Sequence, residues 1–184
     1  MFILAAACAP AATPSKPPQP KEAVAAVTAL PAATQAPVPD LTEAMLKNAK
    51  YELRDLGAFQ LAEGRYEQKY GEGATQVNRA TFQRAALGDL DSDKAADAAV
   101  ILTWNSGGSG TFVNLVAVIN KSGIPQQSAA ELLGDRVQVK SLSIVEGRIV
   151  VQMVGFGPTD PLCCPSQEMT RTYRLEGNTL KPVQ

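Results

Sequence analysis

Apolar residues along the chain fall into short runs whose lengths and alternation are typical of β-strands. Two runs, 98–104 and 111–119, are almost continuously apolar, which predicts strands buried on both faces of a sheet. Residues 105–110 between them are rich in glycine and serine. They lack the Gly-Lys-Ser/Thr ending and the following helix of a phosphate-binding loop, so we expect a hairpin loop.

Shorter runs on either side of this pair predict further strands. Turns at Glu146-Gly147 and at residues 176–178 are expected to close two hairpins. In residues 137–144 the apolar positions alternate as in a strand, but Val137 and Val139 are odd-numbered whereas Leu142 and Ile144 are even-numbered. A bulge near Lys140-Ser141 would put all four side chains on the same face of one strand. A third hairpin is expected across Glu63-Gly64. The candidate strands besides the apolar pair are 51–56, 59–62, 65–70, 80–87, 137–144, 148–154, 170–175 and 179–183.

One short helix is expected before the first strand. Asp40 or Thr42 can cap it, and it would end near Lys50 with Leu41, Met45 and Leu46 on its apolar face. Residues 41–184 are therefore predicted to form a single mainly β domain, a small antiparallel rolled sheet or sandwich with one short N-terminal helix. An α+β fold is the alternative.

Composition changes sharply ahead of this domain. Residues 9–40 hold eight of the chain's 13 prolines and few large apolar residues. Such a segment cannot bury enough surface to fold, so we predict a disordered, Pro/Ala-rich tether.

The first eight residues, Met-Phe-Ile-Leu-Ala-Ala-Ala-Cys, resemble the lipobox of bacterial lipoproteins. The resemblance implies that residues 1–8 are the remnant of a signal, that Cys8 is lipidated, and that the protein is extracytoplasmic and membrane-anchored, at the cell surface or in the periplasm. The run is too short to span a bilayer. No Lys or Arg precedes it, so we expect the true start codon upstream.

Charge and histidine content narrow the classes of function. There are 17 Lys and Arg against 18 Asp and Glu, for a net charge of −1, which argues against nucleic-acid partners. Histidine is absent, which excludes Ser-His-Asp and Cys-His catalysis and every zinc site that uses histidine. No catalytic residue is assigned. Asp135, Arg136 and Asp160 are the participants of an alternative carboxylate-based hydrolase.

Carboxylates recur at alternate positions in residues 88–97. The sequence Gly-Asp-Leu-Asp-Ser-Asp-Lys-Ala-Ala-Asp resembles the calcium loops of FG-GAP and dockerin-type repeats. Its predicted ligands are Asp89, Asp91, Asp93, the carbonyl of Ala95, and Asp97, which would hold Ca²⁺ as a structural ion. Lys94 stands where such loops use glycine, so it must adopt positive φ. The alternative is an acidic, solvated turn whose side chains cap nearby N–H groups.

The other two cysteines are adjacent, in a turn-rich loop at residues 157–166. With Cys8 lipidated, Cys163 and Cys164 form an even pair in an oxidising compartment. We expect a vicinal disulfide; reduced buried thiols and a redox switch remain open.

The segments 88–97, 107–110, 134–137 and 157–166 together resemble a recurrent group of short bacterial lipoproteins with a Pro/Ala tether and a Cys-Cys-Pro loop. That group implies class and location but no activity. We therefore expect a cell-envelope lipoprotein with a non-enzymatic binding or structural domain, whose partners are the membrane and an unidentified envelope protein or ligand. A carboxylate-based hydrolase and a thiol/disulfide redox role are the alternatives.

Overall fold

The computed structural model describes residues 38–73, 75–161 and 163–183, and it confirms a mainly β fold with antiparallel sheets and one short helix near the start of these residues. Within them the elements are α1 (Glu43–Leu46), β1 (Lys50–Leu53), β2 (Gly57–Gln60), β3 (Arg65–Lys69), β4 (Val77–Gly88), β5 (Asp97–Asn105), β6 (Phe112–Lys121), β7 (Ile124–Asp135), β8 (Gln138–Val145), β9 (Arg148–Gly155), β10 (Gln167–Glu176) and β11 (Thr179–Val183).

A five-stranded sheet in the order β3-β4-β5-β6-β7 forms the centre of the domain. Its middle strands, β5 and β6, are buried on both faces, as the apolar runs predicted. Val100 and Leu102 join one hydrophobic cluster, while Ile101 and Leu115 join another. Because successive side chains point to opposite faces of a strand, the same two strands supply both cores.

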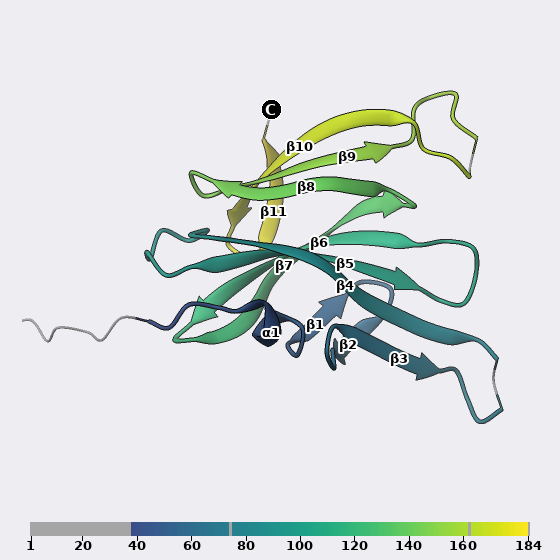
Figure 1. The fold of residues 1–184 in the computed structure, drawn as a ribbon, viewed down its shortest axis with the longest axis horizontal. Helices are drawn as coiled ribbons and strands as arrows, with labels where there is room; N and C mark the ends of the chain where they lie inside the picture. The colour runs from purple at the N-terminus through teal and green to yellow at the C-terminus, as the bar shows by residue number, and fades with distance from the viewer. Residues whose placement is uncertain (1–37, 74, 162, 184) are drawn as a thin grey trace, which may run out of the picture. The chain divides into compact units, whose positions relative to one another are not determined.

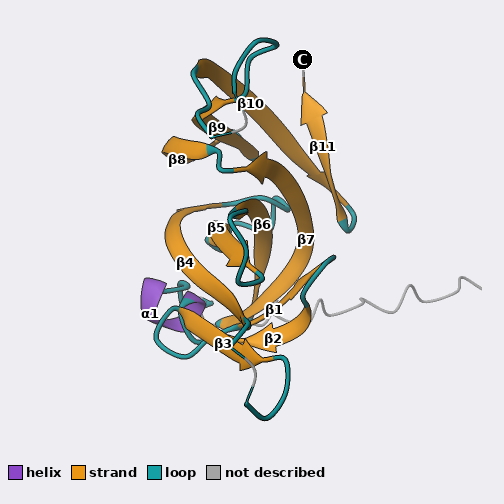
Figure 2. Ribbon diagram, turned by 90° about the vertical axis from the view of Figure 1, so that its right-hand side faces the viewer, coloured by secondary structure: helices purple, strands orange, loops and turns teal. Residues whose placement is uncertain are grey.

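Each face of the central sheet is covered by a different layer. Figure 1 shows α1 and the β1–β2 hairpin on one side and the sheet β11-β10-β9-β8 on the other, and Figure 2 shows the same layers from the side. The first layer contributes Leu46 and Phe59 to one core. The second contributes Ile149 and Val151 to the other.

Strands β4 and β8 come together where the two larger sheets meet. The guanidinium of Arg84 donates a hydrogen bond to the carbonyl of Lys140, at 2.7 Å. Gly88, the last residue of β4, lies so close to Ile144 that a Cβ at this position would stand 2.8 Å from the Ile144 Cβ. This contact fixes the point at which the aspartate loop leaves β4.

Several local predictions are confirmed. Thr42 caps α1 by accepting a hydrogen bond from Met45 N, although the helix ends earlier than expected. The pairing of β8 with β9 shifts register between Val139 and Ser141, where the bulge was expected. Glu146 and Gly147 both have positive φ in the β8–β9 turn, which is the geometry of a two-residue hairpin.

Two features of strand pairing differ from expectation. The turn expected across Glu63-Gly64 is present, since Ala62 and Arg65 exchange two backbone hydrogen bonds across it. The strands beyond it do not continue this pairing: β2 pairs with β1, and β3 pairs with β4. Strand β7 was missed altogether, because its first half is polar and begins with Ile-Pro-Gln-Gln-Ser. It lies at an edge of the central sheet, where one side of a strand is solvated and the apolar signal is weak.

Cys8, the signal remnant 1–8 and nearly all of the tether 9–40 lie outside the described residues. In the described part of the chain, no helix has the length and apolar character needed to cross a membrane.

Candidate functional site

The aspartate loop joins β4 to β5 and is organised by its own carboxylates. Asp89 accepts hydrogen bonds from Ser92 N at 2.6 Å and Lys94 N at 3.1 Å. Lys94 has φ 72°, as the resemblance to calcium loops predicted, and Ser92 has φ 68°. Two non-glycine residues are therefore held in the left-handed region, which costs about 1 kcal/mol or more each.

Asp97 closes the loop from inside the protein. Its side chain is 0% exposed, and its two oxygens accept hydrogen bonds from Leu90 N and Asn120 N, both at 2.8 Å. Burial raises the pKa of this carboxyl, and the charges of Asp91 and Asp93 raise it further, against the lowering effect of the two backbone hydrogen bonds. A nearby cation would favour the charged form of Asp97 and oppose this rise.

Three of the predicted ligands come together in a cluster that could hold a metal ion. One carboxylate oxygen each from Asp89, Asp91 and Asp97 lies within 4.8 Å of the others. Asp93 is used differently, since its Oδ1 accepts a hydrogen bond from Ala95 N at 2.8 Å. A carboxylate has further lone pairs beyond its existing hydrogen bonds, so these bonds do not prevent metal coordination.

Asn120 was not singled out from the sequence, yet it ties the aspartate loop to the start of the described chain. It is 2% exposed. Its side-chain amide donates to the carbonyls of Pro39, at 2.9 Å, and Ala96, at 3.2 Å. Its side-chain oxygen accepts from Gly123 N at 2.7 Å. No sequence signal marks this role, because an asparagine before a turn is common for local reasons alone.

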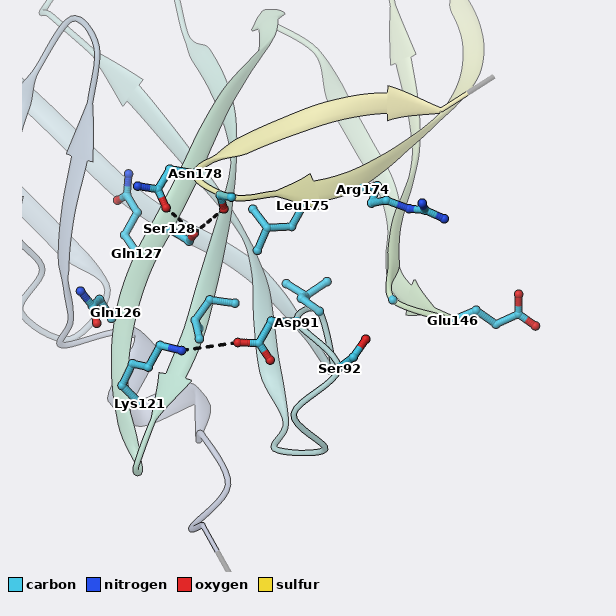
Figure 3. Close-up of a pocket in the computed structure, with 14 residues that line it drawn as sticks. Asp91, Ser92, Lys121, Gln126, Gln127, Ser128, Glu146, Arg174, Leu175 and Asn178 are labelled. Atoms are coloured by element: carbon cyan, nitrogen blue, oxygen red, sulfur yellow. Dashed lines mark hydrogen bonds and ion pairs between the residues drawn. The ribbon is translucent and has the colours of Figure 1, made fainter. Parts of the chain in front are cut away.

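A cleft of about 700 Å³ opens beside the aspartate loop. Figure 3 shows Asp91 and Ser92 on one side, the start of β7 on another, and the β10–β11 hairpin across from them. Leu90, Ile119 and Leu175 supply its apolar surface, and the remaining lining residues are polar or glycine. They are Asp91, Ser92, Lys121, Gln126, Gln127, Ser128, Glu146, Gly147, Arg174, Gly177 and Asn178.

Some of the polar residues that line the cleft form hydrogen bonds or ion pairs with neighbouring segments of the fold. Gln127 donates to the carbonyl of Glu52 and accepts from its N–H, both at 2.8 Å, so it fastens β7 to β1. The hydroxyl of Ser128 donates to the carbonyl of Gly177 at 3.2 Å. Lys121 pairs with Asp91, with 3.4 Å between Nζ and Oδ2. The cleft is thus bounded by cross-links between layers of the fold.

The cysteine loop between β9 and β10 is organised by Asp160. This carboxylate accepts hydrogen bonds from Gly157 N at 2.8 Å, Ser166 N at 2.7 Å and the Ser166 hydroxyl at 2.7 Å. These bonds, with Gly157 N the largest influence, lower the pKa of Asp160. Cys163 and Cys164 are exposed, and their sulfur atoms are placed as in a vicinal disulfide.

The residues considered for a carboxylate-based hydrolase are engaged in local structure. Asp135 and Arg136 pair with each other, with 2.9 Å between Arg136 Nε and Asp135 Oδ2. Asp135 also accepts a hydrogen bond from Thr111 N at 2.8 Å. Asp160 accepts its hydrogen bonds from residues of its own loop. Asp135, Arg136 and Asp160 do not line the 700 Å³ cleft. Their geometry supports structural roles.

Comparison with known proteins adds no assignment: no family model, curated protein or solved structure matches this chain.

Proposed function

We propose that this protein is a cell-envelope lipoprotein, anchored by lipid at Cys8, whose β domain is a non-enzymatic module that binds an envelope protein or ligand in the cleft beside the aspartate loop. The observation that carries the binding role is the cleft itself. Its volume of about 700 Å³ falls within the range of small-ligand sites, about 300–1,000 Å³. Its lining is mostly polar, with apolar surface from three side chains, whereas most such sites are predominantly apolar, so we expect a ligand rich in hydrogen-bonding groups.

Gln126 gives the sharpest test of the cleft, because its side chain is exposed and lines it. Gln126→Trp should fill part of the cleft and leave the core unchanged. The full chain and this variant, each immobilised, are exposed to a detergent-solubilised envelope fraction, and retained material is identified by mass spectrometry. We expect components that the wild type retains and the variant does not. Identical retention by the two proteins would contradict binding in the cleft.

The aspartate loop supports a bound Ca²⁺ with a structural role. Calcium takes six to eight oxygen ligands. One carboxylate oxygen each from Asp89, Asp91 and Asp97, all within 4.8 Å of one another, would supply three of them. Asp93 and the carbonyl of Ala95 are the further predicted ligands. Isothermal titration with Ca²⁺ should show one site in the wild type and none in Asp89→Asn. Asp160→Asn, which removes a carboxylate from the other loop, should leave the site intact.

The lipid anchor is tested separately. Radiolabelled palmitate should be incorporated into the wild-type protein in bacterial cells and not into Cys8→Ser, and the variant should leave the membrane fraction. Label in the variant equal to that in the wild type would contradict lipidation at Cys8.

A thiol/disulfide redox role is the second candidate, favoured by the exposure of Cys163 and Cys164. Exchange requires that a thiolate reach one of the two sulfurs, and both side chains are accessible. Intact-mass measurement after alkylation, with and without reductant, counts the thiols. Two alkylated thiols in the native protein would exclude a preformed disulfide, and failure of a mild oxidant to make them unreactive would then exclude the redox role.

A further inference from the structure

The ion pair between Lys121 and Asp91 lies at the wall of the cleft. The two side chains are 57% and 28% exposed, and an exposed pair of this kind contributes little to stability. Lys121 can form three hydrogen bonds through its ammonium group. Among the described residues, the one carboxylate that pairs with it is Asp91. A ligand carboxylate could therefore replace Asp91 at small cost to the fold.

The rest of the lining supplies hydrogen-bond donors. Gln126, Asn178 and Ser92 line the cleft, and the side-chain oxygen of Asn178 accepts a hydrogen bond from the Ser128 hydroxyl, which leaves the Asn178 amide nitrogen to donate (Figure 3). None of the lining residues, all within the described part of the chain, is aromatic. Stacking of sugars or nucleobases on a ring is therefore not available here. Amide donors together with a cation suit a ligand rich in carbonyl and carboxylate oxygens.

A second cationic group stands at the rim. Arg174 lines the cleft and lies directly opposite Arg148 in the pairing of β10 with β9. Like charges in opposed cross-strand positions repel, and the described residues contain no ion pair for either arginine. Glu146, also at the rim, points outward in Figure 3. An anionic ligand would reduce the repulsion between the two arginines.

We propose that the cleft binds the C-terminal carboxylate of a short peptide, with Lys121 as the anchor and Asp91 as the internal carboxylate that the ligand displaces. The apolar surface of Leu90, Ile119 and Leu175 contacts the side chains of the peptide, and Gln126 and Asn178 donate to its carbonyls. This inference deepens the proposed function and rests on the cleft being its ligand site.

Asp91→Asn and Lys121→Gln give opposite expectations. In EDTA, which keeps the predicted calcium ligand Asp91 free of metal, Asp91→Asn should tighten binding of carboxylate peptides about threefold to tenfold, whereas Lys121→Gln should weaken it about tenfold. Glu131→Gln is the control, because it removes a carboxylate from an exposed residue of β7 that neither lines the cleft nor belongs to the aspartate loop; it should leave affinity unchanged. A structural role for Asp91 alone would give no increase in affinity.

The probes are two equimolar mixtures of N-acetylated tripeptides, one with free carboxylates and one with C-terminal amides. Each is titrated to millimolar concentration into the isotopically labelled full chain, and amide chemical shifts are followed. We expect shifts at cleft residues with the carboxylate mixture and weak ones with the amide mixture. Equal shifts with both mixtures would overturn the role of Lys121, yet leave the cleft as a binding site. No shift with either would overturn the peptide proposal, while retention of envelope material that depends on Gln126 would still support the proposed function.

Discussion

The aspartate loop and the cysteine loop are both organised around one carboxylate, but they place it in opposite environments. Asp97 is fully buried and accepts two backbone hydrogen bonds. Asp160 lies near the surface and accepts three hydrogen bonds within its loop. Burial and neighbouring acids raise the pKa of Asp97, whereas hydrogen bonds lower that of Asp160.

The difference shows what hydrogen bonds alone can and cannot do. In the cysteine loop they are enough to favour the charged carboxylate, because water still solvates it. In the aspartate loop they only partly offset the cost of burying a charge close to Asp91 and Asp93. The cysteine loop is thus complete without a ligand, while the aspartate loop gains from any positive charge that joins it.

The largest expected effect comes from removing the buried carboxylate. Asp97→Ala leaves Leu90 N and Asn120 N without their acceptor, and unsatisfied buried groups of this kind cost about 1–3 kcal/mol each. We expect the free energy of unfolding, measured by urea denaturation, to fall by about 2–5 kcal/mol. Asp160→Ala should cause a smaller loss. Equal losses in the two variants would contradict the contrast between the loops.

A glycine at the start of each loop gives a second comparison. A Cβ at Gly88 would stand 2.8 Å from the Ile144 Cβ, whereas one at Gly157 would meet its nearest atom, Asp160 Oδ2, at 3.6 Å. Gly88→Ala should therefore destabilise the protein by about 1–3 kcal/mol through overpacking. Gly157→Ala should change stability by less than about 0.5 kcal/mol. Thermal melts of both variants measure these changes. A larger loss of stability in Gly157→Ala than in Gly88→Ala would contradict the prediction that only Gly88 is closely packed.

The two loops should also differ in how pH affects them. The raised pKa of Asp97 means that its contribution to stability is present below the unfolded-state pKa and is lost as pH rises through the folded-state pKa. The lowered pKa of Asp160 means that its contribution is present above the unfolded-state value and is lost as pH falls through the folded-state pKa. Asp97→Asn and Asp160→Asn, melted beside the wild type across acidic pH in EDTA, should show these opposite trends. Parallel trends would contradict the pKa directions.

Much of this architecture follows from the sequence, and its limits have physical causes. The doubly buried strands β5 and β6 were predicted because a short, continuous apolar run favours a strand that is covered on both faces. The positive φ of Lys94 followed from its position in the loop. Strand β7 was missed because its polar half is held by Gln127 and Ser128, whose partners lie far away in the chain.

The cleft and the hydrogen bonds of Asn120 could not be predicted either, because they also join residues that lie far apart in the chain. The cleft is lined by residues from 90 to 178, and Asn120 joins Pro39 to the aspartate loop. Such sites depend on how layers of the fold meet, and one sequence carries no periodic signal for that. The spacing of the aspartates in residues 88–97, by contrast, is local, so the three carboxylates that come together could be named in advance.

The most direct test of the central claim, that the aspartate loop is completed by a cation and the cysteine loop is not, is a pair of thermal melts in Ca²⁺ and in EDTA. A ligand at 100 times its Kd stabilises the folded state by about 2.7 kcal/mol, so calcium should raise the melting temperature of the wild type and of Asp160→Asn by the same amount. Asp89→Asn should show no calcium response. Superimposable wild-type curves in Ca²⁺ and EDTA would contradict the account.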